Sequence, residues 1–165
     1  MYKRQGICNG FQALIKSGLL PYGEIRELDE NDLTLFRNDS FHHISTAAIT
    51  RVASTNSPWT QDFEGGELHE VLFSHGEGKL VGKNIEKFKH LAAFQYSDFN
   101  GNATYNGKFN PNNSSYAIEG MISENGLVLG KMGHSERYGT NLYKTKTIQK
   151  KQDIFKNGVN YFKRS

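Results

Sequence analysis

The sequence predicts a single α/β domain. Short, partly alternating apolar runs are typical of strands, turn-rich segments separate them, and other stretches have helical spacing. A chain of 165 residues that is 36% hydrophobic can bury one core. No repeat, linker or low-complexity segment divides the sequence, so we expect one domain.

The first predicted element is a short helix within residues 10–16. Phe11, Leu14 and Ile15 recur at spacings of three and four, and Gly18 then interrupts the pattern before Pro21 breaks it. Cys8 is placed directly before the expected N-terminus of this helix.

The strands and remaining helices follow. Strands are predicted within residues 44–54, 68–75, 91–97, 115–122 and 126–132, with turn sequences such as HGEGK and SENG between them. Residues 82–91 have helical spacing. In the tail, a stripe of four apolar residues predicts a helix that docks on the sheet through that stripe: Ile154, Phe155, Val159 and Phe162.

Composition and charge exclude several classes of protein. The formal net charge is +3, but the basic excess lies at the two ends and is not interleaved with aromatic residues as in a nucleic-acid surface. No run of about 18 apolar residues is present, so no membrane partner is expected. The single Cys cannot form an internal disulfide, which favours a reducing, cytoplasmic location.

The stretch GICNGFQ raises the question of what Cys8 does. A Cys between a strand and a helix, with glycines two residues before and after, resembles a nucleophile on a tight elbow. The positive end of a helix dipole favours the thiolate. A buried, unreactive thiol is the alternative.

A thiol nucleophile needs an imidazole to take and return its proton, and a carboxylate to orient that imidazole. Two His-x-Glu units could supply the pair: His75 with Glu77, and His134 with Glu136. Spacing alone does not choose between them. Neither unit has a third and fourth ligand at a zinc-site spacing, so no metal site is expected.

Six motifs, in order, resemble a known family. GICNGFQ, LLP, SPWT, HGEGK, NPNNS and LGKMGHSER cover residues 6 to about 138 and together resemble the class I glutamine amidotransferase (glutaminase) domain of phosphoribosylformylglycinamidine synthase. The resemblance implies a flavodoxin-like fold, with a mostly parallel sheet and flanking helices. The 126-position separation of Cys8 and His134 resembles the large single-chain form, whose glutaminase is the C-terminal domain.

The resemblance also implies roles for individual residues. Cys8 would attack the side-chain amide of glutamine, His134 would be the general base and acid, and Glu136 would orient His134. The backbone N–H of Asn9 would donate to the oxyanion, and Gln12 would line the glutamine pocket. Further residues are expected to frame the substrate (Tyr96, Asn110, Asn112 and Ser114) or to shape the cleft (His75 and Glu77).

Two departures from the family pattern concern the same motifs. Asn113 stands where many members have Gly, which we expect to be mild because Asn tolerates positive φ. Both prolines around the catalytic His are absent, although His134 and Glu136 are retained.

Residues 1–5 do not have the apolar character of a buried central strand. We therefore expect 1–5 to be a non-family or artefactual start and 6–165 to be an N-terminally truncated amidotransferase domain, poorly active in isolation. ATP and Mg²⁺ would belong to the synthetase portion of the parent chain, which would receive the ammonia; no cofactor is expected here. Two other readings stay open: a catalytically silent docking domain, and a thiol hydrolase with another substrate.

Overall fold

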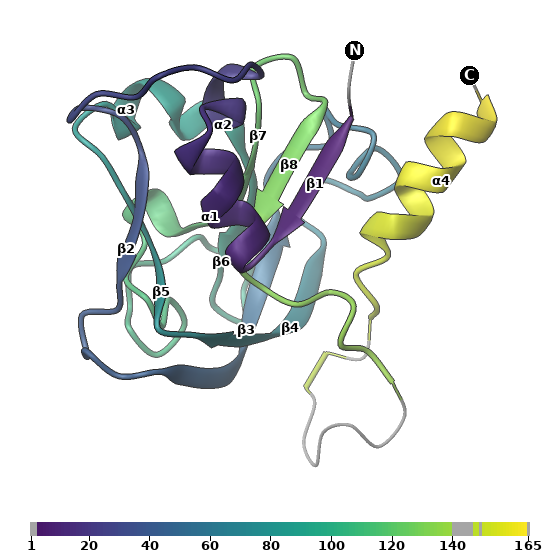
Figure 1. Ribbon diagram of the computed structural model, residues 1–165. Coiled ribbons are helices and arrows are strands. Elements are labelled where there is room, and N and C mark those ends of the chain that lie inside the picture. Colours follow the sequence, from purple (N-terminus) through teal and green to yellow (C-terminus); the bar gives the residue numbers. More distant parts are fainter. Residues whose placement is uncertain (1–2, 140–146, 149, 165) are drawn as a thin grey trace.

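The computed structural model describes residues 3–139, 147–148 and 150–164. Its main feature is a six-stranded sheet with the strand order β1-β8-β7-β6-β3-β4 (Figure 1). These strands are β1 (Arg4–Ile7), β3 (Ile44–Val52), β4 (Leu68–His75), β6 (Ala92–Tyr96), β7 (Ile118–Ile122) and β8 (Val128–Lys131). A second, two-stranded sheet pairs β2 (Thr34–Arg37) with β5 (Glu77–Val81).

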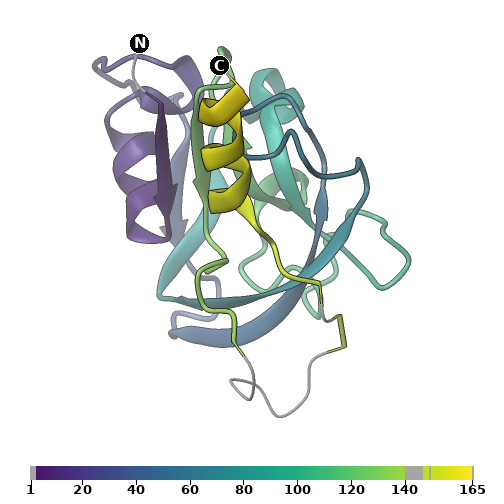
Figure 2. The ribbon, with the colours of Figure 1, turned by 90° about the vertical axis from the view of Figure 1, so that its right-hand side faces the viewer.

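The helices flank the larger sheet. They are α1 (Asn9–Lys16), α2 (Leu19–Tyr22), α3 (Ile85–Phe88) and α4 (Ile154–Arg164), with 3-10 turns at Lys89–Leu91 and Ser115–Ala117. β1 lies between α1 and α4 in both views (Figures 1 and 2). None of the helices among the described residues is long and apolar enough to cross a bilayer.

The α/β class with flanking helices is confirmed, but the expectation of a mostly parallel sheet is wrong for the described strands. β1 and β8 are parallel, whereas the four other neighbouring pairs of the large sheet are antiparallel. Parallel neighbours need a long crossover, while antiparallel neighbours can follow one another directly. β7 and β8, for example, are separated only by residues 123–127.

The five strands predicted from the sequence are all present, but β1, β2 and β5 were missed. Residues 1–5 were not expected to form a strand, yet β1 begins at Arg4. Among the described strands β1 is at the edge of the sheet and pairs only with β8. Arg4 is accordingly exposed while Gly6 is buried. A strand at an edge does not need the continuous apolar run of a buried central strand.

α1 packs closely against β8 because glycine leaves room for it. Phe11 and Leu20 are fully buried, and a Cβ added at Gly130 would lie 2.2 Å from the Phe11 ring and 2.5 Å from Leu20. This contact fixes the helix that follows Cys8 onto the sheet.

α4 does not bury the predicted apolar stripe. Ile154 is fully buried, but Phe155, Val159 and Phe162 are 44–56% exposed. The helix instead contacts Trp59 through a polar and a small residue: Asn157 donates to the Trp59 carbonyl, and a Cβ at Gly158 would lie 2.4 Å from the indole. A helix that docks through a glycine cannot be recognised from apolar periodicity.

Candidate active site

Cys8 sits on a strained turn between β1 and α1. Its φ of 54° and ψ of −110° are unusual for a residue with a side chain. Its N–H donates to the Lys131 carbonyl (2.9 Å), and its carbonyl accepts from the Gln12 N–H (3.2 Å). These bonds hold the turn between the end of β8 and the first turn of α1.

Gly6, two residues before Cys8, has the steric role expected of an elbow glycine. A Cβ at Gly6 would lie 2.5 Å from the Gly10 carbonyl carbon, so only glycine lets β1 and α1 cross at this distance. The prediction of a tight strand-to-helix elbow is therefore confirmed.

The turn opens into a cavity of about 530 Å³. Eleven described residues line it: Ile7, Cys8, Asn9, Gln12, His43, Ser74, His75, Gly76, Glu77, His134 and Arg137. They come from the β1–α1 elbow, the end of β4 and the segment after β8. The cavity therefore brings the predicted nucleophile and both predicted histidines together.

Of the two His-x-Glu units, only the second forms a dyad. His134 Nδ1 lies 2.5 Å from Glu136 Oε1, while its Nε2 is buried with no hydrogen-bond partner among the described residues. The backbone N–H of His134 donates to the Leu72 carbonyl (2.7 Å), which fixes His134 beside β4. A carboxylate at Nδ1 leaves Nε2 as the nitrogen that can take a proton.

Electrostatics keep the Cys8 thiol protonated at rest. Burial raises its pKa; the Asn9 backbone N–H and the Arg137 charge oppose that rise, and Glu136 adds to it. Since the thiol is not a ready-made thiolate, its reactivity depends on a base in the same cavity. The role of the Asn9 N–H as oxyanion donor stays a prediction; its effect on the Cys8 pKa shows that it acts on the reacting group.

A fully buried ion pair between β7 and β8 fixes the backbone on which this site is built. Lys131 Nζ lies 3.2 Å from Glu119 Oε1, and neither side chain is exposed. Lys131 Nζ also donates to the Gly133 carbonyl (2.7 Å), while the Gly133 N–H donates to Glu119 Oε1 (2.6 Å). The pair thus binds both the N–H and the carbonyl of Gly133, the residue before His134. The Lys131 carbonyl accepts the hydrogen bond from the Cys8 backbone N–H.

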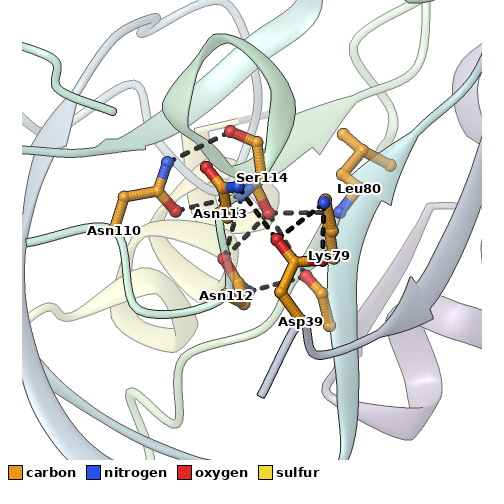
Figure 3. Close-up of polar contacts among 8 residues, drawn as sticks. Asp39, Lys79, Leu80, Asn110, Asn112, Asn113 and Ser114 are labelled. Atoms are coloured by element: carbon orange, nitrogen blue, oxygen red, sulfur yellow. Dashed lines mark hydrogen bonds and ion pairs between the residues drawn. The ribbon is translucent and has the colours of Figure 1, made fainter. Parts of the chain in front are cut away.

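The NPNNS loop does not reach the cavity. Three of its side chains, from Asn110, Asn112 and Ser114, are buried and bind one another and β5 (Figure 3). Asn112 Nδ2 donates to the Gly78 carbonyl (2.6 Å) and to the Tyr96 hydroxyl (2.9 Å), and the Ser114 hydroxyl accepts from the Leu80 N–H (3.1 Å). None of the four residues expected to frame the substrate lines the cavity.

Asn113 behaves as expected for a replacement of Gly. Its φ is 55°, in the left-handed region, and its side chain donates to Asp39 at the surface (Figure 3). The Asp39 carboxylate also pairs with Lys79. The substitution is therefore accommodated in the backbone conformation that glycine would favour.

Gln12, His75 and Glu77 line the cavity as predicted, but not as a second dyad. Gln12 Nε2 donates to the Glu77 carbonyl (3.3 Å). No ion pair joins His75 to Glu77 among the described residues, and neither ring nitrogen of His75 has a hydrogen-bond partner there. His75 is thus part of the cavity wall.

Sequence reasoning missed His43, Ser74 and Arg137. Arg137 follows Glu136 directly, so the His-x-Glu motif could have pointed to it. His43 directly precedes β3 and Ser74 lies near the end of β4, and the two side chains are hydrogen-bonded to each other (3.0 Å). Only the pairing of β3 with β4, in which Ile44 lies opposite His75, brings those two residues to the cavity. Among the described residues no group of three or more His, Cys, Asp or Glu side chains could hold a metal ion.

An α/β fold with a cysteine elbow and a His–Glu dyad in one cavity defines the class of amidotransferase-type, cysteine-dependent domains. The family comparison agrees: residues 4–162 match the model of the CobB/CobQ-like glutamine amidotransferase domain. The chain belongs to this family.

Relatives with assigned names are similar to most of the chain. The phosphoribosylformylglycinamidine synthase subunit PurQ of Acaryochloris marina is 39% identical over 137 residues, covering 80% of this chain and 52% of the relative. The subunit of the same name from Pseudothermotoga lettingae is 34% identical, covering 80% and 51%. The chain therefore spans about half the length of these relatives.

A solved structure supports the fold. The structure of PurLQS from Thermotoga maritima matches with a TM-score of 0.68 and 27% identity, covering 96% of this chain and 61% of that chain. The relatives carry the name of a separate subunit. They do not support the expectation of a large single-chain form.

Proposed function

We propose that this chain is the glutaminase part of phosphoribosylformylglycinamidine synthase, and that Cys8 hydrolyses glutamine to glutamate and ammonia. The observation that carries the proposal is the cavity in which the strained Cys8 elbow meets the His134–Glu136 dyad. The family description supports glutamine as the substrate, and the names of the relatives support the synthase. De novo purine biosynthesis is the pathway that we assign to this reaction.

The chemistry begins with proton transfer from the Cys8 thiol to His134 Nε2. The thiolate attacks the carbon of the glutamine side-chain amide, and the oxyanion of the tetrahedral intermediate accepts from the Asn9 N–H. One such donor lowers the barrier by about 3 kcal/mol. Protonated His134 then gives its proton to the departing nitrogen, and ammonia leaves a glutamyl thioester.

Hydrolysis returns the enzyme to its starting state. His134 removes a proton from water, whose oxygen attacks the thioester carbon, and the Cys8 sulfur leaves and takes that proton back. Glu136 stays ionised throughout and stabilises the imidazolium that forms twice in the cycle. The net reaction converts glutamine and water to glutamate and ammonia.

The partner in this proposal is the synthetase, which takes up the ammonia. That partner uses ATP and Mg²⁺ to convert phosphoribosylformylglycinamide to the amidine. The PurQ names favour a separate synthetase chain over a fusion. A cytoplasmic location is part of the proposal, since a lone reduced Cys8 is its nucleophile.

The test compares glutamine with free ammonia as nitrogen donors. We expect Cys8→Ala, assembled with the synthetase, to lose glutamine-dependent amidine formation by at least about a thousandfold and to keep ammonia-dependent formation. Thr46→Ala, at a half-buried position of β3 outside the cavity, is the control and keeps both.

Normal glutamine use by Cys8→Ala would overturn the nucleophile assignment. A parent protein that uses only ammonia would contradict the glutaminase function itself, and the silent docking domain would then be the better account.

A further inference from the structure

A buried histidine on the cavity wall has a hydrogen-bonding capacity that the mechanism above does not use. His75, the last residue of β4, is 4% exposed and lines the cavity with Cys8. Neither of its ring nitrogens has a hydrogen-bond partner among the described residues. An unmade hydrogen bond at a buried polar group is costly, and at a group that lines a cavity a bound ligand can complete it.

His69, on the same strand, shows what a structural buried histidine looks like here. It is fully buried and, like His75, has no hydrogen bond of good geometry at either ring nitrogen among the described residues, but its Nε2 lies 2.8 Å from Glu67 Oε1 and it does not line the cavity. Burial lowers the pKa of both histidines to about 4. Both rings are therefore neutral near neutral pH, and the difference is that His75 lines the cavity and has no carboxylate at its ring in the described part of the chain.

The residues on either side of His75 contact Cys8 and the helix that follows it. The Cys8 sulfur lies 3.8 Å from the Ser74 carbonyl oxygen, and Gln12 donates to the Glu77 carbonyl. His75 lies between these two contacts. A ligand whose reacting carbon is at Cys8 therefore lies beside the segment 74–77, which includes His75.

The ring is held in one place by its surroundings. A Cβ at Gly78 would lie 2.8 Å from both His75 Cε1 and Nδ1, so the ring rests on the backbone of Gly78. Asn112 and Ser114 bind the Gly78 carbonyl from below. The NPNNS loop thus acts on the site indirectly, by supporting the residue on which His75 rests.

We propose that His75 is a substrate-binding residue. Its neutral ring makes a hydrogen bond to the substrate, which is a small amino acid whose side chain ends in a primary amide. The inference rests on the proposed function and deepens it. It predicts that His75 distinguishes a glutamine-shaped ligand from a small reagent that only needs access to Cys8. The sole cysteine of the chain makes the site of thiol labelling unambiguous.

The test measures two labelling rates on the full chain, followed by intact mass. One probe is a diazoketone analogue of glutamine, and the other is iodoacetamide. We expect His75→Leu to slow the analogue by roughly ten- to a hundredfold, the effect of one lost hydrogen bond to substrate, and to leave iodoacetamide unchanged. His75→Gln, which keeps a hydrogen-bonding group, should recover part of the loss.

Two further variants separate binding from folding. Gly78→Ala displaces the ring without changing His75 and should also slow the analogue selectively. His69→Leu removes a neutral buried histidine outside the cavity and should leave the ratio of the two rates unchanged. Circular dichroism confirms that each variant is folded.

Three outcomes would overturn the inference. One is equal labelling of parent and His75→Leu by the analogue, and another is an equal fall with both probes, which indicates a structural role. The third is a parent chain that reacts with iodoacetamide and never with the analogue; the proposed function then fails, and the inference fails with it.

Discussion

The chemistry proposed for this domain depends on three residues, Cys8, His134 and Glu136. Cys8 and His134 line one cavity, and Glu136 is bound to His134. Their sequence motifs indicate all three, and their catalytic roles stay a prediction. The substrate roles given to the NPNNS loop were inherited from the resemblance. A motif shows which residue types occur together, but it does not show whether their hydrogen bonds point inward or to a neighbouring strand.

The buried Glu119–Lys131 pair yields a prediction at this scale. Glu119→Gln or Lys131→Met alone leaves one uncompensated buried charge and should lower the free energy of unfolding by about 3–5 kcal/mol. The double variant removes both charges and should recover much of that loss. Urea unfolding measures all three.

The exposed Lys83–Glu30 pair supplies the control for that experiment. Lys83→Met should change the free energy of unfolding by less than about 1 kcal/mol, because exposed ion pairs contribute little. Single variants of the buried pair that are as stable as the parent would contradict our account of the support beneath His134.

At the scale of elements, sequence patterns predicted the apolar strands and α1 but not the elements whose burial is partial. Burial alternates along β4, β3 is buried in its second half, and β6, β7 and β8 are almost wholly buried and mostly apolar; all five strands were predicted. β1 and β2 each bury only one of four residues. Because a mostly exposed strand is held by backbone pairing, side-chain periodicity does not reveal it.

The crossing of β1 and α1 gives a prediction about the packing of these two elements. In Gly6→Ala the new methyl would lie 2.5 Å from the Gly10 backbone, which forces the helix away from the strand. We expect a loss of about 1–3 kcal/mol in the free energy of unfolding, as for overpacked cores. Thermal unfolding followed by circular dichroism measures it.

Gly10→Ala is the matched control, since a Cβ there has no neighbour within 4 Å. Alanine has the higher helix propensity, so this variant should be unchanged or up to about 1 kcal/mol more stable. Equal tolerance of alanine at both positions would show that the elbow is not as tightly packed as the structure has it.

For the whole molecule, the buried histidines make stability depend on pH. His69 and His75 have folded-state pKa values lowered by burial from 6.5 to about 4. Below about pH 6.5 the unfolded chain takes up protons that the folded chain does not, so stability should fall as pH decreases toward 4. Urea midpoints in a series of buffers measure this slope.

Variants assign the slope to its source. His69→Gln and His75→Gln each remove one such group, so each should flatten the fall in stability. A slope that persists unchanged in the double variant would mean that other groups govern the acid sensitivity of the domain.

The most direct test of the central claim is to trap the intermediate on Cys8. Isotopically labelled glutamine is added to the chain assembled with the proposed synthetase partner, the reaction is quenched in acid, and the peptide containing Cys8 is analysed by mass. The account predicts a glutamyl adduct on this peptide that hydroxylamine removes and that is absent in Cys8→Ala. Turnover of glutamine with no adduct on Cys8, or with an adduct elsewhere, would contradict it.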